Sequence, residues 1–244
     1  MLIINADDWG RSEAETDAAL KCYRKRRITS VTAMVFMQDS KRAARLAKDY
    51  ELDDVGLHLN FSEEFTDKSC SETLKEHHGR IIGFLKRNKY AQLLYNPSLR
   101  KAFAYCYHAQ VEEFLRVFEK SPSHIDGHHH MHLCANLLLS KLIPAGMRLR
   151  RNFSFWPGEK AFLNRAYRGL VDRWLARRYR LADYFFDLSQ CIQGKKLDRV
   201  AALAKSSNVE LMTHPILNGE QEYLMSDEFQ VILQRLEIGG YALV

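Results

Sequence analysis

The sequence has no long hydrophobic run. No stretch approaches the roughly 18 uninterrupted apolar residues that a membrane-spanning helix needs. The chain opens MLIINADDWG, so its first apolar run ends after four residues, whereas a secretory signal has a charged start and a longer apolar stretch. We therefore expect neither a transmembrane helix nor a secretory signal, and we predict a cytoplasmic protein.

Cysteine is also scarce. The five cysteines are odd in number, widely spaced and without a C-x-x-C pair: Cys22, Cys70, Cys106, Cys134 and Cys191. This pattern argues against a disulfide framework and against a structural zinc site built on paired cysteines. We expect ordinary buried or partly buried thiols.

The length and the order of the apolar segments predict a single α/β domain. The chain has 244 residues, of which 46% are hydrophobic, and one (β/α) barrel typically takes about 250 residues. Strands are expected at residues 2–5, 29–37, 55–59, 123–126, 147–149, 184–188 and 209–213. Helices are expected at residues 12–26, 40–50, 98–120, 133–142, 158–180, 197–206 and 227–238, with loops and short helices over 62–97. Because strands that alternate with helices imply a parallel sheet, we predict one irregular TIM-type, barrel-like domain over residues 1–244, with about seven parallel strands.

Four clusters of polar residues lie at or just past the ends of predicted strands. They are Asp7-Asp8, His58, the segment 124–132 and His214. An Asp-Asp pair alone is often a turn or a helix cap, and a single histidine is often an ordinary structural residue. The segment 124–132 is different, because five histidines and an aspartate within nine residues are costly to bury and hard to explain by packing. Since the carboxyl ends of barrel strands converge on one face, we expect the four clusters to meet in space.

The residue types in these clusters indicate a metal-dependent hydrolase. One carboxylate and two imidazoles form a three-ligand site with positions left open for water, and a divalent cation there lowers the pKa of that water and polarises a carbonyl. Asp7 and Asp8 are adjacent, so their side chains point to opposite sides of an extended chain. One of them can bind the metal while the other accepts the water's proton, and His214 can protonate a leaving amine.

At these residues the sequence resembles the YdjC-like (ChbG) family of carbohydrate deacetylases. The resemblance rests on five segments whose order and spacing match the family over nearly the whole chain: NADDWG at 5–10, ITSVTAM at 28–34, GLHLN at 56–60, SHIDGHHHMH at 123–132 and MTHP at 212–215. The family usually has Phe where this chain has Trp9. Residues 152–195 match weakly, and the chain ends somewhat short of where relatives usually stop, so the natural substrate is left open.

The resemblance implies roles for individual residues. It implies one divalent cation, Mg²⁺ or Zn²⁺, bound by Asp8, His58 and His128. It also implies Asp7 as general base and His214 as general acid, in the hydrolysis of an N-acetyl group on an amino sugar or a short N-acetylglucosamine-containing glycan. Other residues are expected to lie beside the ligands or to face the substrate: His124, Asp126, His130 and His132. Arg150 is expected to orient Asp7 or the substrate.

The formal charge is concentrated in one segment. The chain carries +6, but residues 148–180 alone carry nine arginines and Lys160 against Glu159 and Asp172. We expect a basic amphipathic helix there that packs on the barrel through its apolar counterpart, made up of Ala161, Phe162, Leu170, Trp174 and Leu175. Its arginines would then face a partner or an acidic glycan. The alternative is that the helix lies on an anionic membrane surface.

Rival functions remain open from the residues alone. They are a phosphoesterase, an Fe(II) oxygenase that uses two histidines and one carboxylate, and a basic membrane- or nucleic-acid-binding module. We expect a carbohydrate substrate and no nucleic acid, with peripheral membrane contact as a minority alternative. The oligomeric state is left open, a homodimer being one alternative.

Overall fold

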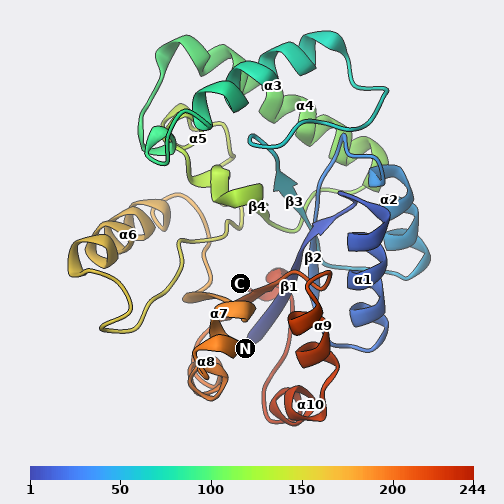
Figure 1. Cartoon of the computed structure of the whole chain (residues 1–244), viewed down its shortest axis with the longest axis vertical. Helices are drawn as coiled ribbons and strands as arrows, with labels where there is room; N and C mark the ends of the chain where they lie inside the picture. The colour runs from blue at the N-terminus through green and yellow to red at the C-terminus, as the bar shows by residue number, and fades with distance from the viewer. The chain divides into compact units, whose positions relative to one another are not determined.

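The computed structural model describes residues 1–244 and shows an α/β chain in which strands alternate with helices (Figure 1). The six strands are β1 (Leu2–Trp9), β2 (Ser30–Ala33), β3 (Val55–Leu59), β4 (Ile125–Gly127), β5 (Tyr184–Asp187) and β6 (Val209–Thr213). The helices are α1 (Glu13–Arg24), α2 (Ser40–Asp49), α3 (Glu72–Leu85), α4 (Arg100–Phe118), α5 (Ala135–Ser140), α6 (Phe162–Leu175), α7 (Leu188–Gln193), α8 (Leu197–Ala204), α9 (Asn218–Met225) and α10 (Asp227–Gln234). No helix is both long and apolar enough to cross a bilayer.

The chain divides into two compact units, and the boundary falls between the two adjacent aspartates. The first unit comprises Met1–Asp7, Asp17–Val31 and Ala145–Val244, and the second comprises Asp8–Thr16 and Thr32–Pro144. Asp7 therefore belongs to the first unit and Asp8 to the second. The prediction of a single domain over residues 1–244 stays a prediction.

In the first unit, the strand order is β2-β1-β6-β5. Strand β1 pairs in parallel with β6, with Ala6 opposite Thr213, and β5 pairs in parallel with β6, with Asp187 opposite Met212. Every residue of β1 and β6 is buried, as expected for parallel strands covered on both faces. The register brings the residues just past Ala6 and Thr213, which are Asp7 and His214, to the same end of neighbouring strands.

In the second unit, the strand order is β4-β3-β2. Strands β3 and β4 are parallel, and His58 lies opposite Asp126. Helix α4 packs against both α3 and β3, and the rings of Phe61 and Phe103 meet in the core with their centroids 5.2 Å apart. After Gly127, the chain turns sharply, because His129 and His130 take left-handed backbone conformations.

The structure confirms six of the seven expected strands, but the strand expected at residues 147–149 is wrong. Only an isolated bridge between Arg148 and Arg180 forms there. Beyond it, the amide of Asn152 donates to a side chain, Asp172 Oδ1, at 3.0 Å.

Two helical expectations are also corrected. The segment 62–97, expected to hold loops and short helices, contains the 14-residue helix α3. Ser71 caps its first turn, accepting from the amide of Leu74, and its buried residues recur at helical spacing: Leu74, His78, Ile81, Ile82 and Leu85. The basic helix expected over 158–180 spans only Phe162–Leu175, and Gly158, at φ 92°, lies in the turn that precedes it.

Candidate active site

A carboxylate between two imidazoles forms the centre of the candidate site in the second unit. Asp8 Oδ1 lies 2.9 Å from His128 Nδ1 and 3.3 Å from His58 Nε2. The potential ligand atoms of these three residues all lie within 4.8 Å of one another, and all three residues are buried. The fold thus brings together the three residues expected as metal ligands, although they are up to 120 positions apart in sequence.

The environment of His58 is suited to a cation. Its Nδ1 lies 2.7 Å from Asp126 Oδ1, and a carboxylate can only accept, so this nitrogen carries a proton. In a neutral imidazole the other nitrogen, Nε2, then presents a lone pair to Asp8. Two acceptors in contact need a positive charge between them, supplied by a bound metal ion or by a second proton on the ring. A carboxylate that holds the far nitrogen of a metal-binding histidine is a recurrent arrangement in metal sites.

A second acidic residue reaches the same cluster. Glu63 Oε2 lies 2.9 Å from His128 Nε2, and Arg11 Nε lies 2.9 Å from the same Glu63 oxygen. With neutral imidazoles, the carboxylates of Asp8, Asp126 and Glu63 outnumber the single guanidinium of Arg11. The cluster therefore carries a net negative charge, which a divalent cation would offset.

The carboxylate of Asp8 is held in its ionised form. Burial raises its pKa, but hydrogen bonds and charges from His128 and His58 outweigh this effect and hold the pKa of Asp8 well below its usual range. Asp8 also has a φ of 66°, a left-handed conformation that a non-glycine residue adopts at a cost. Strand β1 therefore departs from regular strand geometry at Asp8.

Most of the histidine-rich segment lies outside this three-residue cluster. His124 is fully buried, with Nδ1 2.9 Å from Ser123 Oγ. His132 is fully buried behind the turn, where its backbone nitrogen lies against Gly127. His130 is only partly buried and meets the ring of His132 edge-on. Of the residues expected beside the ligands, Asp126 contacts one of them, through His58.

In the first unit, Asp7 belongs to a fully buried ionic network. The guanidinium of Arg150 donates to both oxygens of Asp7, at 2.7 and 2.6 Å, and its Nε donates to Glu210 Oε1 at 2.7 Å. Asn5 Nδ2 donates to Asp7 Oδ1 at 2.8 Å, and the hydroxyl of Tyr241 donates to Glu210. Arg150 therefore orients Asp7 by a two-point contact, one of the two alternatives expected from the sequence.

His214 follows β6 and is only partly buried. Its backbone amide donates to Glu220 Oε2 at 2.6 Å, and its ring lies with the carboxylates of Asp187 and Glu220 in a group whose polar atoms are within 4.8 Å of one another. Burial raises the pKa of Asp187, while the backbone hydrogen bond from Gln190 and the charge of His214 lower it in part. The imidazole thus has acidic neighbours that can orient it.

The sequence reasoning missed several residues of these clusters. Asp187 ends a predicted strand, as the other site residues do, and could have been found by that rule. Glu210 is a charged residue inside a short apolar run and gave a similar signal. Glu63, Glu220 and Tyr241 lie in segments without a motif, and only the tertiary structure brings them to the site.

A family model described as YdjC-like protein matches residues 1–235. The chain belongs to the YdjC-like family. The resemblance drawn from the five sequence segments is therefore confirmed, and the family match spans both compact units.

Individual relatives extend this finding. A chitooligosaccharide deacetylase of Proteus mirabilis is 28% identical over 228 residues, which cover 88% of this chain and 81% of the relative. Chitooligosaccharide deacetylases of Serratia marcescens and Yersinia pestis (strain Pestoides F) are 29% and 30% identical, and each alignment covers 54% of this chain and 51% of the relative. With these two, the chain aligns over about half of their length.

A solved structure shows the same fold. It is a crystal structure from Enterococcus faecalis V583, provisionally described as a cellobiose-phosphate cleavage protein. Its TM-score is 0.67 at 19% identity, and the match covers 98% of this chain and 97% of that one. The likeness confirms the barrel-like α/β fold expected from the order of strands and helices.

Proposed function

We propose that this protein is a metal-dependent carbohydrate deacetylase that removes the acetyl group from an amino sugar. The observation that carries the proposal is the carboxylate of Asp8 between His58 and His128, joined by one peptide bond to Asp7, which Arg150 holds in a buried network. The curated relatives named chitooligosaccharide deacetylases support this activity.

Asp8, His58 and His128 would hold one divalent cation. Two imidazoles and one carboxylate suit Zn²⁺, whereas additional carboxylate and water ligands would suit Mg²⁺. When bound, the cation polarises the acetyl carbonyl and lowers the pKa of a water molecule. Asp126, through its contact with Nδ1 of His58, would fix the orientation of that ring and leave Nε2 to hold the cation.

The chain's own residues then move the protons. Asp7 accepts a proton from the attacking water as its oxygen adds to the acetyl carbon. Arg150 fixes the position of the Asp7 carboxylate through two hydrogen bonds. His214 donates a proton to the amide nitrogen as the carbon–nitrogen bond breaks. The products are acetate and a free amine, so that one water molecule is consumed for each bond cleaved.

Two substitutions separate metal binding from proton transfer. Asp7→Asn should lower turnover by about 10²–10⁴-fold while cation binding persists, and His58→Ala should abolish cation binding. The measurements are acetate release from N-acetylglucosamine oligomers and bound metal by calorimetric titration. Asp49→Asn and His108→Ala, which change exposed residues on α2 and α4, serve as matched controls and should change neither quantity.

The outcomes distinguish the proposal from its rivals. Near-normal turnover in Asp7→Asn would remove Asp7 as the base. Release of phosphate from sugar phosphates, without acetate from any N-acetyl sugar, would favour the phosphoesterase alternative and overturn the deacetylase. The same screen identifies the natural substrate class, for which we propose a short glycan containing N-acetylglucosamine.

A further inference from the structure

Helix α6 leaves its most apolar face open to solvent. Leu163, Tyr167, Leu170 and Trp174 recur at spacings of three and four, so they form one stripe along the helix. Leu163 is 79% exposed and Leu170 is 61% exposed, and Phe162 at the first turn is 76% exposed. The expectation that this apolar side packs on the barrel is therefore wrong for Phe162, Leu170 and Trp174. Only Leu175 of that set is buried in the helix.

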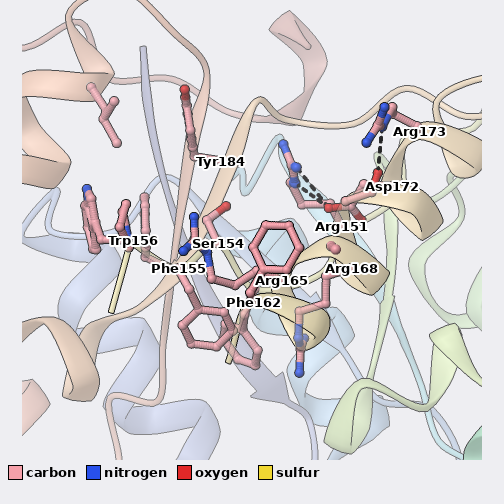
Figure 2. Close-up of a pocket in the computed structure, with 16 residues that line it drawn as sticks. Arg151, Ser154, Phe155, Trp156, Phe162, Arg165, Arg168, Asp172, Arg173 and Tyr184 are labelled. Carbon is pink, nitrogen blue, oxygen red and sulfur yellow. Dashed lines mark hydrogen bonds and ion pairs between the residues drawn. The ribbon is translucent and has the colours of Figure 1, made fainter. Parts of the chain in front are cut away.

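The helix is attached to the first unit through a narrow contact. Its buried residues are Asp172 and Leu175, and Asp172 is fixed by Arg151 at 2.9 Å and by Asn152 at 2.8 Å. Between α6 and β5 lies a cavity of about 660 Å³. Figure 2 shows the aromatic side chains and arginines of α6, β5 and the preceding loop that line it. The helix thus gains little stability from apolar burial, although it has the residues for it.

Two exposed arginines flank the apolar stripe on one side. Arg173 and Arg177 are exposed next to Leu170 and Trp174, and neither forms an ion pair with a carboxylate. Arg168 lies on the attached side of the helix, with Asp172 and Leu175, where it lines the cavity. Its guanidinium stands 5.3 Å from the ring of Phe155, and burial lowers its pKa. The surrounding segment 148–180 carries a net charge of +8, so the rest of the chain sums to −2.

Charge decides what can cover this face. A second copy of the chain would bring an identical basic face against it, because a two-fold interface uses the same patch on both partners, and the like charges would repel. Nucleic acid would neutralise the arginines but would leave the leucines at the centre of the stripe unburied. An anionic bilayer can cover both the arginines and the leucines, because its headgroups contact cationic side chains and its acyl boundary takes up apolar ones. Tyr and Trp are also enriched at that boundary.

We propose that α6 binds the surface of an anionic phospholipid membrane. Leu163, Leu170 and Trp174 enter the boundary between headgroups and acyl chains, while Arg173 and Arg177 contact lipid phosphates. The helix then lies in the plane of the interface and does not span the bilayer. This surface would bring the enzyme to amino sugars displayed on or linked to a membrane, but the binding itself does not depend on the deacetylase activity.

The experiment is co-sedimentation of the whole protein with vesicles of phosphatidylcholine alone or mixed with phosphatidylglycerol. Binding is expected only to the mixed vesicles and should weaken as salt increases, because ions screen the attraction. Arg173→Ala with Arg177→Ala should lower partitioning about 25-fold, since each arginine near an anionic surface contributes about fivefold. Leu163→Ala with Leu170→Ala should lower it on the order of 100-fold. The variants should fold, because these side chains make few contacts.

A matched control tests whether α6 itself is responsible. Leu93 and Leu94 form an exposed pair outside α6, at 49% and 57%, and replacing both with alanine should leave partitioning unchanged. A second readout uses vesicles with brominated acyl chains, which should quench the fluorescence of the wild-type protein but much less that of Trp174→Phe.

Three results would overturn the proposal. The first is no binding to phosphatidylglycerol vesicles at low salt. The second is equal loss of binding in the Leu93/Leu94 and Leu163/Leu170 pairs. The third is a lipid-independent dimer, detected by sedimentation velocity, that dissociates when Leu163 and Leu170 are replaced.

Discussion

At the residue scale, two adjacent aspartates have separate environments. Asp7 is held by Arg150 and Asn5, whereas Asp8 contacts His58 and His128. The chain leaves regular strand geometry at Asp8, where φ is 66°, and this single dipeptide supplies both a candidate base and a candidate metal ligand. Arg150 is central to the environment of Asp7, because the same guanidinium also neutralises the buried carboxylate of Glu210.

Replacing Arg150 should test how strongly this network stabilises the fold. Arg150→Met leaves the carboxylates of Asp7 and Glu210 buried without a cation, and we expect a loss of about 3–5 kcal/mol in the free energy of unfolding. Arg150→Lys keeps the charge but not the two-point contact, and it should lose less. Denaturant unfolding measures both. Adding Glu210→Gln to Arg150→Met should restore part of the loss, and an unchanged stability in Arg150→Met would contradict the role of the network.

A buried histidine makes the stability depend on pH. Burial lowers the pKa of His78 to about 4 from an ordinary 6.5, and its ring stacks on Phe65 and lies 3.0 Å from the carbonyl of Asn60. The unfolded chain takes up a proton at this residue below pH 6.5, whereas the folded chain takes it up only below about pH 4. The stabilisation from neutral His78 is therefore complete above pH 6.5 and is lost as the pH falls towards 4.

His78→Gln isolates this contribution. Glutamine can donate to the same carbonyl but does not titrate in this range. Between pH 6.5 and pH 4 the free energy of unfolding should fall by about 3 kcal/mol less in His78→Gln than in the wild type, since each pKa unit corresponds to about 1.4 kcal/mol. Parallel pH profiles of the two proteins would show that His78 is not responsible.

At the element scale, the two glycines of α3 and the glycine of β3 serve different purposes. Gly79 and Gly83 lie on the exposed side of α3, and a methyl group added to either meets nothing within 4 Å. At Gly56 in β3, an added methyl group would lie 2.5 Å from the ring of His124. Strand β3 therefore needs glycine for the close approach of a buried histidine, while α3 does not need its glycines.

Alanine substitutions should shift stability in opposite directions at these positions. Gly79→Ala and Gly83→Ala should each stabilise the protein by up to about 1 kcal/mol, because alanine is the better helix former. Gly56→Ala should destabilise it by about 1–3 kcal/mol through overpacking. Thermal and denaturant unfolding of the three variants would check this, and a stable Gly56→Ala protein would show that His124 can move aside at little cost.

At the scale of the whole molecule, metal binding should raise the stability. A ligand that binds only the folded state stabilises it by about 2.7 kcal/mol at 100 times its dissociation constant. We expect the melting temperature to rise on addition of the cognate divalent cation and to fall again with a chelator. His58→Ala should show neither change, and His108→Ala should show both. If neither Mg²⁺ nor Zn²⁺ shifts the melting temperature of the wild type, the proposed site does not hold these ions.

The sequence by itself determined the alternation of strands and helices, the family and the residues that meet as candidate ligands. Apolar runs in the sequence mark the buried strands, and the carboxyl ends of parallel strands meet at one edge. Asp8, His58 and His128 lie at or just past such ends, so their meeting could be predicted. Tertiary structure decided the partners that arrive from unmarked segments. Glu63 reaches His128, and Glu210 and Tyr241 complete the network around Asp7, through contacts that no spacing in the sequence encodes. It also decided which face of α6 is buried: an amphipathic pattern shows that a helix has an apolar side, but only the packing of Asp172 and Leu175 shows that this side faces outward.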